Sequence, residues 1–288
     1  MPKVSVCIPA YNQVNYLKIA LNSVLLQTFT DYEVIVTDDT PGPMVKELID
    51  QFDFGGKLHY FKNQVSLGSP QNWNEAIEKS SGEYVKILHH DDWFEQNDSL
   101  EKYVKLLDDN SGCGMAFSAS LVKLENGRQW VHEISDEDVA EISRSPASLF
   151  LGNKIGSPSA VIFRKTVFEP FDPNLKWLVD IEFYIRVIGK NAAICYCSEA
   201  LITTFGATGR VSDICIDNPD VEIFENFYVF DKIKDQFSLN RRLYLGRCLG
   251  HLLLLCRKYK ISAASHIRRF GYTGRIPFRL LIWLKFGK

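Results

Sequence analysis

The chain has 288 residues, of which 46% are hydrophobic and 24% charged, and its net charge is −2. This composition excludes an intrinsically disordered protein, which needs few apolar residues and a high net charge. The length fits one large α/β domain or two closely joined ones. The seven cysteines are an odd number without metal-like spacing, so we expect reduced thiols, as in the cytosol. The N-terminus does not resemble a signal peptide, and no stretch approaches the roughly 18 apolar residues of a transmembrane helix.

Strand and helix signals alternate over the first hundred residues. This alternation predicts an α/β fold with right-handed crossovers and a mostly parallel sheet. The predicted strands are 4–8, 33–37, 58–61 and 84–88. The predicted helices are 16–26, capped by Asn15, then 44–52, and a third that Ser69 caps and Pro70 begins, ending near Lys79.

The pattern changes beyond residue 110. Further strands are predicted at 114–119, 121–124, 159–164 and 192–205, with a helix at 180–188. Asn126-Gly127 is a hairpin signal, and the chain is helical from residue 220 onward. Because no linker composition separates these parts, we expect two subregions of one compact body, at 1–110 and 111–215, plus a helical C-terminal extension at 216–288.

Polar clusters follow the predicted strands of the first subregion. Ligands of open α/β sheets bind at the carboxyl ends of strands. Residues 9–12, Asp38-Asp39 and 89–92 (HHDD) occupy such ends, and Asn63 with residues 68–74 forms a fourth cluster. Adjacent carboxylates repel unless a cation or donor lies between them. Oxygen ligands in small number suit Mg²⁺ or Mn²⁺.

Two long segments carry a family resemblance. Residues 4–39 (VSVCIPAYNQVNYLKIALNSVLLQTFTDYEVIVTDD) and 72–93 (NWNEAIEKSSGEYVKILHHDDW) resemble family 2 glycosyltransferases with the GT-A fold. The resemblance is to the inverting, metal-dependent enzymes that build bacterial surface polysaccharides, and it covers about residues 3–212. It implies a nucleotide-sugar-binding half at 1–110 and an acceptor-binding half at 111–215.

The resemblance implies a pocket for the nucleotide base. Pro9, Tyr11 and Asp39 would line this pocket, with Asp39 bonding a uracil-type base edge and Tyr11 stacking on the base. The alternatives are a surface aromatic for Tyr11 and a helix cap for Asp39.

The metal motif departs from the family pattern. Aligning LHHDD with the usual LDSDD places His89 at the first Asp, His90 near the ribose and Asp91 at the metal-binding Asp. The resemblance therefore implies that Asp91 binds Mn²⁺ or Mg²⁺. Asp92 is either part of the functional site or only a cap or a supporting partner. His89 is either a satisfied polar group or a nucleotide contact; a weak imidazole metal site is a further option, although neighbouring strand side chains point apart.

The phosphate-binding segment departs as well. Many relatives have Arg-Asn where this chain has Gln71-Asn72, and Gln cannot replace a bidentate Arg. The pyrophosphate would then depend on the metal, on N–H groups of the helix opening at Ser69, or on Arg210. Asn72 either contacts the ligand or braces the loop. Ala207 stands near the position where many relatives have a His.

The segment WLVDIEFYIRV resembles the acceptor-side motif of the family. It implies that Asp180, six residues before Arg186, is the catalytic base that removes the acceptor hydroxyl proton. The alternatives are an Asp180 that caps the helix and pairs with Arg, and Glu182 as the base. Residues 156–159 are either a loop that lines the sugar pocket or an ordinary turn.

The C-terminal tail is basic. Residues 236–288 hold 12 Lys and Arg and no Asp or Glu, whereas the remainder has 21 Lys and Arg against 35 Asp and Glu. Cations interleaved with Leu, Phe and Trp283 are typical of an amphipathic helix on an anionic membrane. The alternatives are a tail that packs on the acidic body and a nucleic-acid-binding tail, for which no recognition motif is present.

We therefore expect a cytoplasmic enzyme at the inner face of the cell membrane. It would move a sugar from a nucleoside diphosphate, UDP in first place, to a hydroxyl of a glycan or lipid-linked glycan, and would not bind nucleic acid. A non-catalytic GT-A-like scaffold or sugar-nucleotide sensor is the alternative. A nucleotidyltransferase would need a Gly-rich loop after the first strand, and the sequence has none there.

Overall fold

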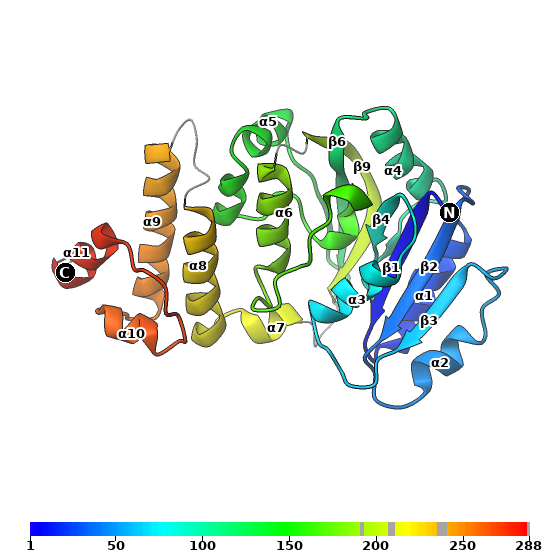
Figure 1. Cartoon of the computed structure of the whole chain (residues 1–288), viewed down its shortest axis with the longest axis horizontal. Coiled ribbons are helices and arrows are strands. Elements are labelled where there is room, and N and C mark those ends of the chain that lie inside the picture. Colours follow the sequence, from blue (N-terminus) through cyan, green and yellow to red (C-terminus); the bar gives the residue numbers. More distant parts are fainter. Residues whose placement is uncertain (191–192, 207–210, 235–240, 287–288) are drawn as a thin grey trace.

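The computed structural model describes residues 1–190, 193–206, 211–234 and 241–286. The molecule is elongated (Figure 1), with the N-terminal strands at one end and helices α8 to α11 at the other. The strands are β1 (Val4–Ala10), β2 (Tyr32–Asp38), β3 (Leu58–Lys62), β4 (Tyr84–Ile87), β5 (Trp93–Phe94), β6 (Cys113–Leu124), β7 (Gln129–His132), β8 (Val161–Arg164) and β9 (Ala193–Gly206). The α-helices are α1 (Val14–Leu25), α2 (Met44–Ile49), α3 (Gln71–Lys79), α4 (Ser99–Asp108), α5 (Asp136–Arg144), α6 (Val179–Gly189), α7 (Val211–Cys215), α8 (Pro219–Ile233), α9 (Arg241–Lys258), α10 (Ala264–Arg268) and α11 (Phe278–Phe286). Short 3₁₀ turns lie at η1 (Pro146–Leu151), η2 (Pro158–Ala160) and η3 (Lys165–Val167).

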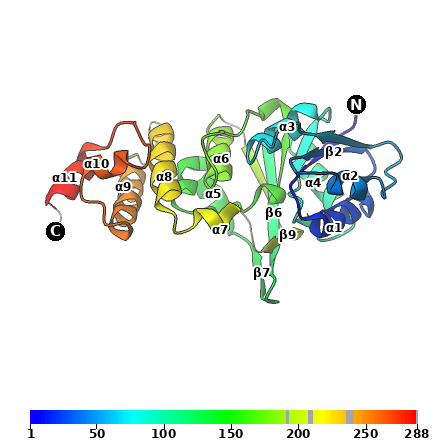
Figure 2. The same cartoon turned by 90° about the horizontal axis from the view of Figure 1, so that it is seen from below.

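One sheet runs through the body in the order β3-β2-β1-β4-β8-β6-β9-β5, with β7 paired to β6. Strands β1 to β4 are parallel, β8 is antiparallel to both β4 and β6, and β6 runs parallel to β9. Most strands therefore share one direction, and β5, β7 and β8 oppose it. The β6–β7 hairpin projects from the body (Figure 2).

Helices cover both faces of the sheet. Val6 and Ile8 of β1 face a core that includes side chains of α1, α2 and α4, whereas Cys7 faces a second core with α3 and α6. This alternation follows from the two-residue repeat of a strand. The second core continues into α8 and α9, so the C-terminal helices share the hydrophobic core of the body.

These observations confirm the α/β fold with a mostly parallel sheet, flanking helices and a C-terminal helical extension. The sheet is continuous across residue 110. Two capping predictions are wrong: α1 already begins at Val14, which places Asn15 inside the helix, and α3 begins after Pro70 without a side-chain cap from Ser69. The strands predicted at 114–119 and 121–124 are one strand, β6.

The expectation of reduced thiols is wrong for one pair. Cys113 at the start of β6 and Cys195 on β9 form a disulfide. The strands that carry these residues are parallel neighbours, which brings the two sulfurs together. The remaining five cysteines are free thiols. Among the described helices, none is both long enough and apolar enough to cross a membrane.

Candidate active site

A cleft of about 1310 Å³ lies at the carboxyl ends of β1, β2 and β4 and reaches the C-terminal helices. Parallel strands bring their carboxyl ends to one edge, which explains why segments distant in sequence meet there. The predicted site residues that line the cleft are Pro9, Tyr11, Asp39, Asn72, His90, Asp91 and Asp180. Arg210 and Ala207 lie outside the described residues.

Asp39 follows β2 and fixes the loop before α3. Its Oδ1 accepts hydrogen bonds from the Asn63 side-chain amide at 2.7 Å and from the Leu67 N–H at 3.0 Å, and its Oδ2 accepts from the Gly68 N–H at 2.7 Å. A carboxylate has about four acceptor positions, so Asp39 retains capacity for one donor from the cleft. The preceding Asp38 is fully buried.

Tyr11 follows β1, and His90 follows the neighbouring strand β4. The Tyr11 side chain is half exposed and lines the cleft, as a stacking residue must. The His90 Nδ1 atom lies 3.2 Å from the main-chain oxygen of Pro9, which orients the imidazole beside the same strand end. These residues and Asp39 therefore surround one part of the cleft.

Asn72 is 4% exposed, and both the nitrogen and the oxygen of its amide contact the protein. Its Nδ2 lies 3.3 Å from the main-chain oxygens of both Ala10 and Thr37, and its Oδ1 accepts from Asn63 at 2.9 Å. These bonds join α3 to the ends of β1 and β2. They favour the bracing role for Asn72, and a direct ligand contact stays a prediction.

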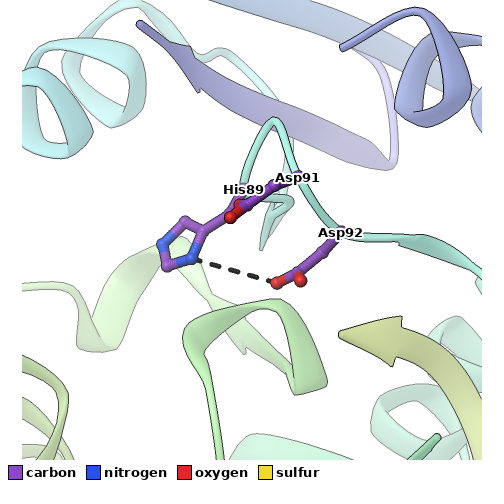
Figure 3. A group of neighbouring side chains, drawn as sticks. All are labelled: His89, Asp91 and Asp92. Carbon is purple, nitrogen blue, oxygen red and sulfur yellow. Dashed lines mark ion pairs between the residues drawn. The ribbon is translucent and has the colours of Figure 1, made fainter. Parts of the chain in front are cut away.

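His89, Asp91 and Asp92 form a candidate metal centre (Figure 3). One ligand atom from each lies within 4.8 Å of the others, and the His89 Nδ1 faces the Asp92 carboxylate at 3.9 Å. Carboxylate oxygens with one imidazole nitrogen are a ligand set that suits Mn²⁺. Structural zinc sites are instead built from cysteine and histidine. At the first-Asp position of the motif, His89 thus offers an imidazole nitrogen in place of a carboxylate.

His89 is not the satisfied polar group that we considered. Its Nε2 atom is buried and has no hydrogen-bond partner among the described residues, although its main-chain N–H donates to the Ser159 hydroxyl at 2.9 Å. Its ring packs against Trp73, with centroids 4.6 Å apart. Burial lowers the pKa of His89 to about 4. The imidazole is therefore neutral near pH 7, as a metal ligand must be.

Asp92 is the buried member of the centre. It accepts a hydrogen bond from the Phe205 N–H at 3.1 Å, and the Ser157 hydroxyl lies 3.5 Å from it. Burial, with a further contribution from the charge of Asp91, raises the pKa of the Asp92 carboxyl above its usual range. A nearby cation would compensate both effects.

Asp180 lies in the first turn of α6 and is partly buried. Its Oδ1 accepts a hydrogen bond from the Ile181 N–H at 2.8 Å, and its Oδ2 accepts from the Asn153 side-chain amide at 2.7 Å. Burial raises the pKa of Asp180 to about 7. A carboxylate with a pKa near the working pH is well suited to general-base catalysis.

Glu182 and Arg186 have structural contacts instead. Glu182 is 2% exposed and pairs with Arg186 at 3.0 Å and with Lys232 of α8 at 2.6 Å. Arg186 also pairs with Glu169 at 3.1 Å. Within the described part of the chain, Arg186 pairs with these glutamates and not with Asp180, and Glu182 does not line the cleft.

Sequence reasoning missed several residues of the cleft, among them Asn153 and Trp73. Asn153 follows η1 and joins Asp180 to the 156–159 loop, because its Nδ2 also donates to the Gly156 oxygen at 3.0 Å. In the sequence, the only indication of this role is the amide of Asn153, an isolated Asn in a polar stretch. Trp73 lies within the family-like NWNE segment and could have been found there. The loop itself contributes Ser157 and Pro158 to the cleft.

The sequence of this chain matches the profile of glycosyl transferase family 2 over residues 5–171, more than half of its length. The chain belongs to glycosyl transferase family 2. This match confirms the family resemblance and the assignment as a glycosyltransferase.

Three similar proteins illustrate the relationship. A GalNAc(5)-diNAcBac-PP-undecaprenol beta-1,3-glucosyltransferase of Campylobacter jejuni is 28% identical over 171 residues, which are 59% of this chain and 54% of that protein. The structure of S. aureus TarS 1-349 with UDP-GlcNAc aligns with a TM-score of 0.65 and 19% identity, covering 96% of this chain and 77% of that one. The mannosyltransferase PcManGT of Pyrobaculum calidifontis, in complex with GDP-Man and Mn²⁺, aligns with a TM-score of 0.59 and 16% identity, covering 98% and 85%. The two structures support the fold.

Proposed function

We propose that this family 2 enzyme is a metal-dependent, inverting glycosyltransferase that uses a UDP-sugar. The observation that carries the proposal is a single cleft that contains both the candidate metal centre and Asp180. A displacement at an anomeric carbon needs positive charge beside the departing diphosphate and a base beside the attacking hydroxyl. The cleft offers a site for each.

Pro9, Tyr11, Asp39 and His90 form the proposed nucleotide pocket. Tyr11 stacks on the base, and the remaining acceptor position of Asp39 receives the N–H of a uracil edge. TarS, crystallised with UDP-GlcNAc, has the same fold, which supports UDP as the first donor to test. GDP is the second, since PcManGT was crystallised with GDP-Man.

Asp91 is the proposed principal metal ligand, supported by His89 and Asp92. The His89 Nδ1 atom, which faces Asp92 at 3.9 Å, and the two closely spaced carboxylates fit a divalent cation. When bound, Mn²⁺ or Mg²⁺ would supply the positive charge that stabilises a departing diphosphate. Gln71 stands where many relatives have Arg, so this chain lacks that guanidinium as a partner for the diphosphate.

Asp180 is the proposed base. The acceptor hydroxyl oxygen forms a bond to the anomeric carbon as the bond between that carbon and the diphosphate oxygen breaks. The electron pair leaves with the nucleoside diphosphate, and the hydroxyl proton moves to the Asp180 carboxylate. One displacement from the opposite face inverts the anomeric configuration. Asn153 and the Ile181 N–H hold the carboxylate while it accepts the proton.

The acceptor enters from the part of the cleft that α8 and α9 line. Glu222 and Asn226 of α8, with His251 and Leu254 of α9, join Trp177 there. Polar and apolar side chains side by side suit an amphipathic acceptor. The proposed acceptor group is a hydroxyl of a lipid-linked glycan. A relative whose name specifies a PP-undecaprenol-linked glycan supports this class.

The basic tail is proposed to hold the enzyme at the inner face of the cell membrane during cell-surface polysaccharide or lipopolysaccharide synthesis. Arg268, Arg269, Arg275 and Arg279 are exposed, and Phe278 is 75% exposed. One of the interleaved apolar residues, Trp283, lies against Arg257 of α9, with 4.6 Å between the guanidinium carbon and the ring centroid. This contact lies within the tail itself. The tail meets the body through buried α9 residues such as Leu252, which join its hydrophobic core, while the four arginines stay exposed.

A donor screen tests the proposal. Thermal shift with UDP- and GDP-sugars, each with Mn²⁺, Mg²⁺ or EDTA, is followed by an assay of sugar-nucleotide hydrolysis for every sugar that stabilises the chain. We expect stabilisation and slow hydrolysis of at least one UDP-sugar, only with metal. Metal-independent binding without turnover would support the scaffold instead.

A further inference from the structure

A buried carboxylate of α8 holds the segment that leads into the helix of the proposed base. The Glu225 Oε1 accepts a hydrogen bond from the Lys176 N–H at 2.7 Å. Its Oε2 accepts from the N–H groups of Trp177 at 3.0 Å and Leu178 at 2.8 Å. Glu225 is 2% exposed and comes from the C-terminal extension, some 45 residues further along the chain.

Three successive main-chain donors therefore converge on one side chain. Buried N–H groups need partners, and these three lie just before the helix, where no strand or helix bond is available to them. Charge-assisted bonds to a carboxylate are about twice as strong as neutral ones. The last of the three donors belongs to Leu178, the N-cap residue of α6, and Asp180 lies two residues beyond it.

We propose that Glu225 is a positioning residue for Asp180, which it sets by clamping residues 176–178 at the start of α6. This inference rests on the proposed role of Asp180 as the base. It makes the C-terminal extension part of the catalytic apparatus, because α8 fixes where α6 begins and hence where the carboxylate meets the acceptor. A misplacement of about 1 Å can reduce a rate by about a hundredfold.

The chain offers a matched control at the same interface. Glu182 is a second glutamate, also 2% exposed, that joins α6 to α8 through Lys232. Its partners are side-chain cations away from the cleft rather than the N–H groups before α6. Replacing either glutamate by Gln removes one buried charge, but only Glu225→Gln disturbs the clamp, since the Gln amide would direct N–H groups toward N–H donors.

A double-mutant cycle tests the inference on the full chain. Transfer kcat and the affinity for UDP with Mn²⁺ are measured for Glu225→Gln, Asp180→Asn and the double variant. We expect Glu225→Gln to lower kcat by about ten- to hundredfold with unchanged UDP affinity. In the Asp180→Asn background it should cause no further loss, because the group that it positions is already gone. Glu182→Gln should change kcat by less than about twofold.

Each contrary outcome has a distinct meaning. An equal loss in both backgrounds, or an equal loss in Glu182→Gln, would overturn the positioning role. If Asp180→Asn alone transferred at the wild-type rate, the proposed base would be wrong instead. Should Glu225→Gln fail to fold, the same cycle is run with Glu225→Asp, which keeps the charge with a shorter reach; an unchanged kcat in that variant would also overturn the inference.

Discussion

The Asn153 side-chain amide donates a hydrogen bond of 2.7 Å to the Asp180 carboxylate. The same nitrogen donates to the Gly156 oxygen, and the Gly156 N–H donates back to the Asn153 Oδ1 at 2.9 Å. One amide thus connects α6 to the loop that carries Ser157 into the cleft. The orientation of the proposed base and the position of this loop in the cleft are therefore linked.

Replacing the proposed base should separate binding from transfer. Asp180→Asn keeps the volume of the side chain but cannot accept a proton, so we expect transfer to fall by about 10²–10⁴-fold. Affinity for UDP with Mn²⁺ should remain, because the metal centre is intact. The transfer rates of Asp180→Asn and Glu182→Gln are measured with the donor that the screen identifies. Wild-type transfer by Asp180→Asn, with loss in Glu182→Gln, would exchange the two roles.

The acid limb of the pH profile should report Asp180. Its pKa is raised to about 7, and only the deprotonated carboxylate accepts a proton. We therefore expect kcat/KM to rise about tenfold per pH unit below 7 and to level off above it. The free energy of unfolding should change in the opposite direction with pH. Because the pKa is raised in the folded state, protonation of Asp180 stabilises that state. This stabilisation is complete below the unfolded pKa of about 4 and is lost as the pH rises through 7. A profile that is flat from pH 5.5 to 8 would contradict the assignment.

Removing the amide donor should move that limb. In Asn153→Ala the carboxylate loses a hydrogen bond that favours its charged form, so the apparent pKa should rise above 7 and transfer at pH 7 should fall. The pH profiles of Asn153→Ala and the wild type are compared at saturating donor. A limb at unchanged pH would show that this bond does not act on the base.

The tail should bind anionic membranes. Each cation near an anionic surface contributes about 1 kcal/mol within a Debye length of about 8–10 Å. We expect flotation with anionic but not zwitterionic liposomes, weakened by salt, and release when Arg268, Arg269, Arg275 and Arg279 are together changed to Gln. Turnover on a soluble acceptor should persist in that variant. Equal flotation with both liposome types, or with neither, would favour a tail that only packs on the body.

Short sequence patterns predict the N-terminal strands and the site residues that follow them. The β-branched runs of β1, β2 and β4 and the polar residues that follow them place Pro9, Asp39 and Asp91 at one sheet edge, as the structure confirms. Helix starts were less predictable, because α1 begins at Val14 without a side-chain cap, so its first residue has no capping signal in the sequence.

Contacts between residues far apart in the chain could not be predicted from the sequence. The Cys113–Cys195 disulfide depends on the pairing of β6 with β9 across 82 positions, which no spacing rule indicates. The clamp of Glu225 joins two segments whose proximity follows only from the packing of α8 on the body. The free imidazole nitrogen of His89 likewise depends on its three-dimensional surroundings, so the same residue type could have been satisfied in another fold.

The binding of UDP with and without Mn²⁺ tests the central claim most directly. Asp91 follows β4 and lies beside His89 and Asp92, whose side chains could complete a cation site. By isothermal titration calorimetry we expect Mn²⁺-dependent UDP binding by the wild type, loss of that dependence in Asp91→Asn with an unchanged Tm, and wild-type behaviour in the control Asp98→Asn, an exposed carboxylate paired with Lys102. The same UDP affinity in Mn²⁺ and in EDTA, or unchanged Mn²⁺-UDP affinity in Asp91→Asn, would contradict the account.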